Sequence, residues 1–257
     1  MNTLISVNDI TIKFGGLVAI HDVSFQVAAG EIHALIGPNG AGKTTILNMI
    51  SGLYRPAEGR IIFNGQSIVG RSPHVITRLG IARTFQNIRV FEGLSILESI
   101  MVARQVRSSV NLISTLLKTP SARREERDIV KKATQALELV GLNHRKEMDA
   151  INLPCGQKRL MEIARALATG PKLLLLDEPS AGLNEKETRD LVELLDQLRK
   201  QGMTLILIEH NMRLVMNVSD RISVLDHGDK IAEGKPAEIQ HNPKVIAAYL
   251  GTDNYHA

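Results

Sequence analysis

The stretch Gly37-Pro38-Asn39-Gly40-Ala41-Gly42-Lys43-Thr44 decides how this chain folds. It fits the spacing G-x-x-x-x-G-K-S/T, and it stands between an apolar run at residues 32–36 and a helical pattern that starts near Thr44. Glycines let successive backbone N–H groups turn inward, and the start of the following helix adds partial positive charge. The stretch therefore predicts a phosphate-binding loop, in which Lys43 reaches the β and γ phosphates and Thr44 offers its hydroxyl to magnesium.

Two acidic residues follow a second apolar run. Residues 173–176 are all leucine, and Asp177 and Glu178 come directly after them. Seen alone, such a pair is usually an ordinary solvated loop at the end of a strand. Beside a phosphate loop we favour a catalytic interpretation, in which Asp177 binds magnesium through water and Glu178 polarises the attacking water.

Hydrophobic patterning places both motifs in an α/β fold. The runs at residues 173–176 and 205–208 are continuously apolar, which is typical of strands buried on both faces of a parallel sheet. Between them leucines recur at helical spacing, with Asn184 placed to cap the helix and Gly202 to end it. Short strands separated by turns are predicted nearer the N-terminus, at residues 5–12, 23–27, 32–36 and 61–63.

The middle of the chain, residues 88–160, differs from the rest in composition and charge. The whole chain has a net charge of +4, but residues 101–135 hold eight basic and three acidic side chains, so the remainder sums to −1. The segment is helix-forming and is broken at Pro120 and Gly141. We expect a helical subdomain inserted into the α/β core, with a basic surface that is either solvated or a contact face.

Composition excludes several classes of protein. Hydrophobic residues make up 44% of the 257, which is enough for a buried core in one large domain. One cysteine and no Cys/His metal spacing exclude a disulfide scaffold and a zinc module. The first residues lack the pattern of an export signal, and no uncharged run approaches the roughly 18 residues of a spanning helix. We expect a protein that is neither exported nor membrane-spanning.

The order of these motifs resembles that of the ATP-binding cassette (ABC) ATPases over almost the whole chain. The resemblance implies that Phe14 stacks on adenine, that Gln86 links the magnesium and water site to the helical subdomain, and that His210 contacts the γ-phosphate. An isolated Phe at a strand end is more often a core residue, and an isolated His is usually structural. Residues 180–184 resemble the loop that crosses to a partner subunit, with Asn184 where the family more usually has aspartate.

The signature motif is where this chain departs from the family. The usual pattern is Leu-Ser-Gly-Gly-Gln, and the chain has Leu153-Pro154-Cys155-Gly156-Gln157 before a predicted helix over residues 161–168. Pro154 suits a first helical position but lacks the hydroxyl that normally touches the γ-phosphate on the opposite subunit. Gly156 and the helix start can still bind phosphate. Cys155 is interpreted as a small packing residue, since no nearby His or carboxylate pattern makes it a nucleophile.

The resemblance implies a fold, a reaction and an assembly. The fold is a P-loop (RecA-like) core with a parallel sheet, an N-terminal antiparallel β subdomain and an inserted α-helical subdomain. The core takes residues 1–87 and 161–257, and the helical subdomain takes residues 88–160. Two subunits face head to tail, and each ATP lies between one phosphate loop and the partner's signature. Because Pro154 weakens this chain's signature, we expect that, in a heterodimer, the site built on this signature is the weaker one.

The site residues implied by the resemblance fall into three groups. ATP is hydrolysed with Mg²⁺, Glu178 is the base, and Lys43, Gln86 and His210 are the other catalytic residues. Mg²⁺ is held by Thr44, Gln86 and Asp177. The ATP contacts are Phe14, Gly37, Pro38, Asn39, Gly40, Ala41, Gly42, Lys43, Thr44 and Thr45.

A finer resemblance points to the cargo. Residues 14–19, 116–121, 207–212 and 245–251 resemble the ATP-binding subunit of branched-chain amino-acid importers. Those systems pair two different ATPases with two membrane permeases and a periplasmic binding protein, which implies a peripheral place on the cytoplasmic face of the inner membrane. The ATPases of urea/amide importers and of the lipopolysaccharide exporter share parts of this pattern and remain alternatives.

Other functional classes fit less well. Soluble ABC ATPases of DNA repair or translation need a coiled-coil insertion or two cassettes in one chain, and the sequence has neither. GTPases need an Asn-Lys-x-Asp motif, which does not occur. A non-catalytic binding module is expected to lose Lys43 or Glu178. No nucleic-acid recognition motif accompanies the net charge, so we expect no nucleic-acid partner.

Overall fold

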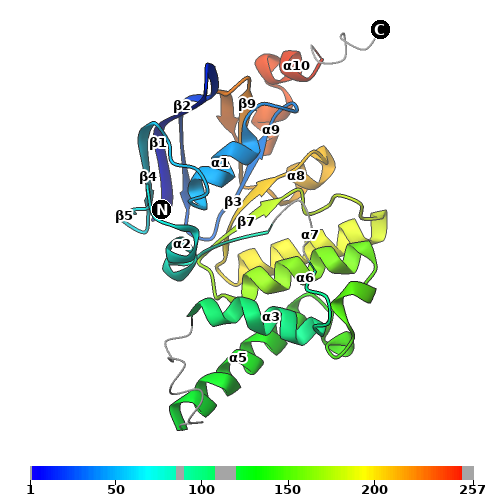
Figure 1. Cartoon of the computed structure of the whole chain (residues 1–257). Helices are drawn as coiled ribbons and strands as arrows, with labels where there is room; N and C mark the ends of the chain where they lie inside the picture. The colour runs from blue at the N-terminus through cyan, green and yellow to red at the C-terminus, as the bar shows by residue number, and fades with distance from the viewer. Residues whose placement is uncertain (1, 85–89, 108–119, 251–257) are drawn as a thin grey trace.

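The computed structural model, which describes residues 2–84, 90–107 and 120–250, contains an antiparallel sheet near the N-terminus (Figure 1). Its strands are β1 (Thr3–Phe14), β2 (Leu17–Ala28), β4 (Glu58–Phe63) and β5 (Gln66–Ser67), in the order β2-β1-β4-β5. Ile5 on β1 pairs with Val27 and with Phe63, and all three side chains are buried. The predicted N-terminal strands are confirmed, and β1 and β2 are longer than the apolar pattern indicated.

The second sheet is the core of the molecule. Its strand order is β10-β9-β3-β8-β7-β6, and every neighbouring pair is parallel except β9 and β10. Every residue of β3, β7 and β8 is buried, which explains why these segments read as unbroken apolar runs. The strands are β3 (Ile32–Ile36), β6 (Ile81–Arg83), β7 (Leu173–Asp177), β8 (Thr204–Ile208), β9 (Arg221–Asp226) and β10 (Asp229–Gly234).

Helices cover both faces of the core sheet. On one face α1 (Lys43–Ile50) packs between the two sheets, where Leu173 and Leu175 of β7 point. On the other face Leu174 and Leu176 pack against α6 (Cys155–Ala168) and α7 (Glu185–Lys200). As predicted, Asn184 caps α7, with its side chain accepting from the Glu187 N–H at 2.9 Å. The remaining helices beside the core are α2 (Pro73–Leu79), α8 (Met212–Val218), α9 (Pro236–Gln240) and α10 (Pro243–Leu250).

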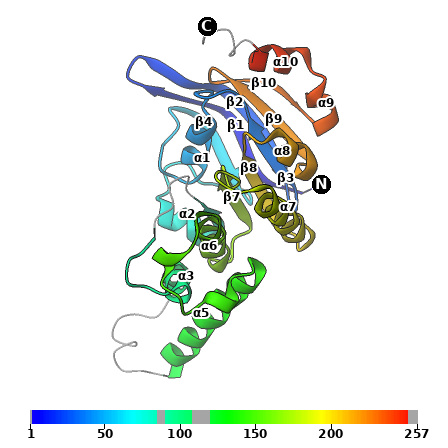
Figure 2. The same cartoon turned by 90° about the vertical axis from the view of Figure 1, so that its right-hand side faces the viewer.

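The helical insertion predicted for the middle of the chain is present. Helices α3 (Ile96–Arg104) and α5 (Pro120–Leu139) pack on α6, with short 3-10 turns at Gln105–Arg107, Asn143–Arg145 and Ala150–Asn152. Figures 1 and 2 show α3 and α5 at the opposite end of the molecule from α9 and α10. The predicted subdomain boundary between residues 160 and 161 falls inside the continuous helix α6, and that division stays a prediction.

The start of α6 differs from the sequence prediction. The helix after the signature begins at Cys155, so the predicted start at residue 161 was too late, and Pro154 is the N-cap rather than the first helical residue. The physical reason is that Gly156 is accommodated within the first turn, against the side chain of Glu187.

Among the described residues, no helix is both long and apolar enough to cross a membrane.

Candidate ATP-hydrolysing site

The candidate site lies where the parallel strands of the core sheet end. Strand β8 lies between β3 and β7, and β6 is the neighbour of β7 on the other side. Since the carboxyl ends of parallel strands share one edge, the segments that follow these strands meet there. The edge therefore brings together the phosphate loop after β3, the acidic pair at the end of β7 and the histidine after β8.

The phosphate loop, residues 37–44, is shaped by two glycines that no other residue replaces without strain. Gly37 has φ 148° and Gly42 has φ 98°. A Cβ at Gly37 would lie 2.0 Å from the carbonyl oxygen of Leu225, and one at Gly42 would lie 2.3 Å from Ile20 Cδ1. The close backbone approach explains the glycine spacing read from the sequence. Gly42 is also the N-cap of α1. The first backbone N–H groups of α1, which have no partner within the helix, therefore lie next to the phosphate loop, where they can bind an anion.

Lys43 lies across the loop, and its contact with the β and γ phosphates stays a prediction. Its Nζ donates to the carbonyl oxygens of Gly37 at 2.7 Å and Pro38 at 2.8 Å. Burial lowers the pKa of Lys43, and the negative charges of Glu178 and Asp177 act in the opposite direction. At the start of α1 the Thr44 side chain is exposed and Thr45 is half-buried. Lysine and hydroxyl groups therefore stand on the same short segment.

Asp177 is the buried acid of the pair, with 1% of its side chain exposed. Its Oδ2 accepts from Arg83 Nη2 at 2.9 Å, and its backbone N–H is directed at Thr84 Oγ1 at 3.4 Å. Its other oxygen, Oδ1, is buried and has no hydrogen-bond partner within the described ranges 2–84, 90–107 and 120–250. A buried carboxylate oxygen of this kind, with the Thr44 hydroxyl, fits the hard oxygen ligands that Mg²⁺ prefers. Gln86, the third predicted ligand, lies outside the described residues.

Glu178 is held by the histidine that follows the neighbouring strand β8. Its Oε1 is 3.1 Å from Nε2 of His210, and its backbone N–H donates to the Ile208 carbonyl at 2.9 Å. Glu178 has φ +49°, which is uncommon for a residue with a side chain. Strained backbone of this kind concentrates at functional sites, where it aims a side chain. Two residues that the sequence placed in separate motifs are thus in direct contact.

Glu209 is a site residue that sequence reasoning missed. It is 3% exposed, and its Oε1 accepts from the Ser180 N–H at 2.7 Å. Its Oε2 accepts from the N–H groups of His210 at 3.1 Å and Asn211 at 3.3 Å. One buried carboxylate therefore joins the segment that carries His210 to the loop at residues 180–184. Its position between an apolar run and the histidine was the available signal.

Arg83 is the second residue that was missed. Besides Asp177, its guanidinium binds Asn48 Oδ1 at 2.6 Å and Ser51 Oγ at 3.1 Å, both at the end of α1. Only 6% of its side chain is exposed, so the charge pair with Asp177 is buried. It fixes the buried acid to the helix that begins in the phosphate loop. No motif in the sequence around Arg83 predicted that it would pair with Asp177.

Phe14 lies at the tip of the hairpin between β1 and β2 and is 45% exposed. Its ring meets that of Tyr54 edge to face, with the ring centroids 5.2 Å apart. Tyr54 follows α1 and is itself 40% exposed, and the sequence analysis did not single it out. Two exposed aromatic rings thus form a small platform, and stacking of Phe14 on adenine stays a prediction.

The signature segment, residues 153–157, contacts the chain that follows Glu178. Leu153 is buried and Pro154 is exposed, and Cys155 is exposed at the first turn of α6. A Cβ at Gly156 would lie 2.5 Å from Glu187 Oε1, and one at Gly182 would lie 3.8 Å from Cys155 Sγ. Gln157 has its Oε1 buried without a hydrogen-bond partner in the part of the chain that the structure describes. Pro154 and Cys155 therefore stand exposed at a helix start, so the interpretation of Cys155 as a packing residue was wrong, and contact of this segment with a partner's ATP stays a prediction.

Comparison with protein families gives two matches. Residues 20–181 match the family described as ABC transporter, and residues 230–254 match the family described as branched-chain amino acid ATP-binding cassette transporter. The first match covers more than half of the chain and spans the phosphate loop, the signature segment and the acidic pair. The second covers β10, α9 and α10.

Known proteins resemble the chain over nearly its whole length. The high-affinity branched-chain amino acid transport ATP-binding protein LivG of Escherichia coli (strain K12) is 45% identical over 96% of this chain and 98% of that protein. Its counterpart BraF of Pseudomonas aeruginosa is 44% identical over the same shares. A crystal structure of the ADP conformation of an ABC transporter cassette has a TM-score of 0.85 and 32% identity, covering 98% of this chain and all of that one. The chain therefore belongs to the ATP-hydrolysing, ATP-binding proteins of ABC transporters, in the branched-chain amino-acid subfamily that includes LivG and BraF.

Proposed function

We propose that this chain is the ATP-hydrolysing subunit of an importer for branched-chain amino acids, at the cytoplasmic face of the cell membrane. The observation that carries the proposal is the meeting of Lys43, Asp177, Glu178 and His210 at one edge of the core sheet. Membership in the branched-chain amino-acid subfamily supports the cargo. The amino acid itself would be bound by the permeases and a periplasmic protein.

The geometry supports a division of labour among the four side chains. Glu178 accepts a proton from water as the water oxygen attacks the γ-phosphorus, and the bond from that phosphorus to the bridging oxygen of ADP breaks. His210, in contact with Glu178, keeps that carboxylate oriented and faces the γ-phosphate. Lys43 supplies positive charge to the transferred group, once its bonds to the loop carbonyls give way to phosphate. These groups stabilise charge that develops only in the transition state.

The fit of Mg²⁺ to this site rests on oxygen donors. Thr44 and Asp177 would hold the ion, with Gln86 as the predicted third ligand. Bound Mg²⁺ neutralises charge on the β- and γ-phosphate oxygens. Arg83 keeps one oxygen of Asp177 engaged at 2.9 Å, which leaves Oδ1 for the ion.

The working assembly that we propose is a heterodimer of two ATPase subunits. Each ATP lies between the phosphate loop of one subunit and the signature of the other, so neither subunit alone has a complete site. Loop residues 180–184, tied to His210 through Glu209, form the crossing segment. Because Pro154 has no hydroxyl, the site completed by this chain's signature is the weaker one.

Reconstitution tests the proposed function. The full chain is assembled in liposomes with its partner ATPase and permeases, and ATP hydrolysis and leucine uptake are measured with the binding protein present. We expect hydrolysis to rise with permease and with loaded binding protein, and to be unaffected by DNA or ribosomes. Uptake of urea or extraction of lipopolysaccharide in place of leucine uptake would overturn the cargo. Recovery of the chain from cells only with ribosomes or DNA would overturn the transporter role.

A further inference from the structure

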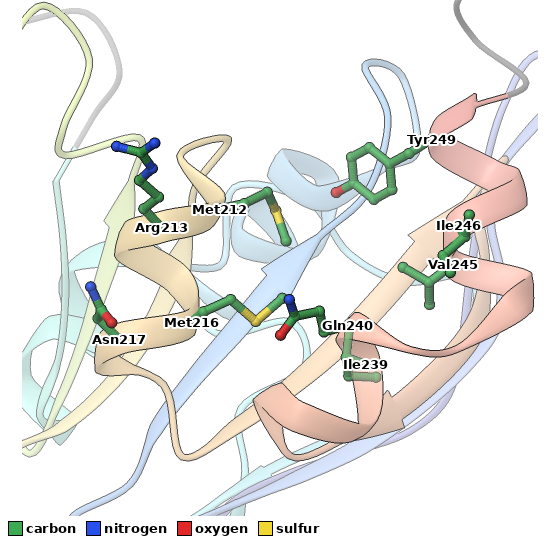
Figure 3. A pocket seen from close by; sticks show the side chains of 9 residues that line it. All are labelled: Met212, Arg213, Met216, Asn217, Ile239, Gln240, Val245, Ile246 and Tyr249. Atoms are coloured by element: carbon green, nitrogen blue, oxygen red, sulfur yellow. The ribbon is translucent and has the colours of Figure 1, made fainter.

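An apolar cavity separates α8 from the two C-terminal helices. Its volume is about 680 Å³, and Figure 3 shows Met212 and Met216 of α8 facing Val245, Ile246 and Tyr249 of α10. None of these residues belongs to the motifs that hold nucleotide. The cavity nevertheless adjoins the site, because α8 begins two residues after His210 and β3 ends at the phosphate loop.

Tyr249 reaches across this cavity to the phosphate loop. Figure 3 shows its side chain leaving α10 with the hydroxyl directed toward α8. The hydroxyl oxygen accepts a hydrogen bond from the backbone N–H of Gly37. Burial raises the pKa of Tyr249 above its usual value, and the bond from Gly37 acts against that rise. The hydroxyl is therefore protonated at neutral pH, and its oxygen is available to the amide.

The backbone amide of Gly37 determines the position of the first residue of the phosphate loop. Gly37 is the first residue of the phosphate loop and is buried, with the Leu225 carbonyl oxygen 2.0 Å from where a Cβ would stand. A buried backbone N–H requires a partner, and Tyr249 supplies it from a helix more than two hundred residues away in the sequence. Tyr249 thus holds the amide at which the loop begins, and the Leu225 backbone leaves no room there for a side chain.

The ring of Tyr249 packs on the apolar cluster against which α8 also packs. It packs with Met212 and Met216 on a cluster that includes Ile36 of β3 and Val215 of α8. Asn211 caps α8 by accepting from the Leu214 N–H at 3.2 Å, which attaches the start of the helix rigidly to His210. One side chain of α10 therefore contacts the first residue of the phosphate loop and the apolar cluster that supports α8, the helix next to His210.

We propose that Tyr249 is a positioning residue for ATP, whose hydroxyl sets the phosphate loop and whose ring sets α8 and His210. The proposal rests on the proposed function in two respects, ATP binding at the phosphate loop and the role of His210 in hydrolysis, and the cargo does not enter. Tyr249 lies within residues 230–254, which match the branched-chain amino acid cassette family, so this segment would help to position the ATP site. The hydroxyl and the ring have separable effects.

Two substitutions in the full chain separate the two roles. Tyr249→Phe keeps the ring and leaves the Gly37 amide buried without its partner, so we expect ATP to bind about five- to tenfold more weakly. We expect kcat in the assembled transporter to stay within about twofold, because α8 keeps its packing. Tyr249→Leu removes the ring as well and should lower kcat in addition to weakening binding. Binding is measured by calorimetry with ATP, and KM and kcat by phosphate release.

Ile246→Ala is the matched control, since Ile246 lies on the same helix, lines the same cavity and is 45% exposed. We expect this variant to bind ATP as the unaltered chain does. The inference is overturned if Tyr249→Phe binds ATP normally, or if Ile246→Ala weakens binding by the same factor. Equal loss of kcat and affinity in Tyr249→Phe, together with a lowered Tm, would also overturn it as a general loss of stability. Failure of the unaltered chain to bind ATP would instead contradict the proposed function.

Discussion

The phosphate-loop half and the signature half of the composite ATP site that we propose are built differently within this chain. The phosphate-loop half consists of residues 37–45 with Arg83, Asp177, Glu178, Glu209 and His210, and it stands on buried strand ends joined by charge pairs and hydrogen bonds. The signature half consists of residues 153–157 at the exposed start of α6, where the N-cap side chain makes no capping bond. The first half is held by contacts within the chain, whereas the second is an exposed segment that, in the dimer we propose, a partner completes.

This difference indicates where substitutions act. In the phosphate-loop half, a change removes a member of a network, and the remaining members are left buried without partners. In the signature half, a change alters one contact to a nucleotide on another subunit. We therefore expect large effects on stability and turnover from the first half and modest, subunit-specific effects from the second.

The largest effect is expected from Arg83→Met. The substitution leaves Asp177 charged, buried and unpaired, which should lower the free energy of unfolding by about 3–5 kcal/mol. Urea unfolding of the full chain measures it. Arg55→Met, at an exposed arginine, should change stability by less than about 0.5 kcal/mol. Adding Asp177→Asn to Arg83→Met should recover part of the loss, and a double variant as unstable as the sum of both single variants would contradict the pairing.

Glu178→Gln is expected to have the next largest effect. The amide cannot accept the proton of water, so turnover should fall by roughly 10² or more while ATP is retained and a stable dimer is favoured. Phosphate release and size-exclusion chromatography with ATP are the measurements. Glu193→Gln, on α7, serves as the control for loss of a carboxylate. Near-normal turnover of the Glu178 variant would remove this residue from the role of base.

A smaller effect, confined to one site, is expected from Pro154→Ser. It is introduced together with Lys43→Ala, which disables this chain's own phosphate loop and leaves only the site that its signature completes. The new hydroxyl offers the γ-phosphate a charge-assisted hydrogen bond, so residual ATP hydrolysis should rise by about tenfold. In the reciprocal test, the P-loop lysine is replaced in each subunit in turn. Equal losses from the two subunits would show that the sites do not differ.

The smallest effect concerns the basic surface of α5. Arg123, Arg124, Lys131 and Lys132 are exposed, while Ala133 and Leu137 on the same helix are buried. Replacing the four bases with glutamine should weaken recovery with permease-containing membranes by about threefold, because each exposed charge contributes less than about 1 kcal/mol. ATP binding should be unchanged. The control replaces four exposed bases elsewhere, namely Arg55, Arg60, Arg71 and Lys244. Equal losses from both sets would identify a solvated face rather than a contact.

The phosphate-loop half could be predicted well because its signals are local. Glycine spacing, an unbroken apolar run and the residue after it specify Lys43, Asp177 and Glu178 without knowledge of neighbours. Arg83 and Glu209 escaped prediction because their roles arise from strand pairing. Arg83 meets Asp177 across 94 positions of sequence only because β6 lies beside β7.

The signature half and the helix boundaries were predicted less well. Pro154 suits the start of a helix, but the apolar pattern indicated a helix only from residue 161 and Gly156 has low helix propensity, yet α6 begins at Cys155. Tertiary packing overrides the propensity, since the Glu187 side chain lies against the Gly156 backbone. The hydrogen bond between Tyr249 and Gly37 was not predicted either, because the sequence around Tyr249 does not indicate which distant amide its hydroxyl contacts.

The exposed thiol of Cys155 has a practical consequence. It is the only cysteine in the chain, and it stands at the face that a partner's nucleotide would approach, close to Gly182 on the crossing loop. A maleimide fluorophore can be attached there without first removing other cysteines. Its fluorescence would change when the two subunits approach each other. In the assembly that we propose, this unusual signature residue would therefore make the approach and separation of the two subunits observable in real time, on the unmodified sequence.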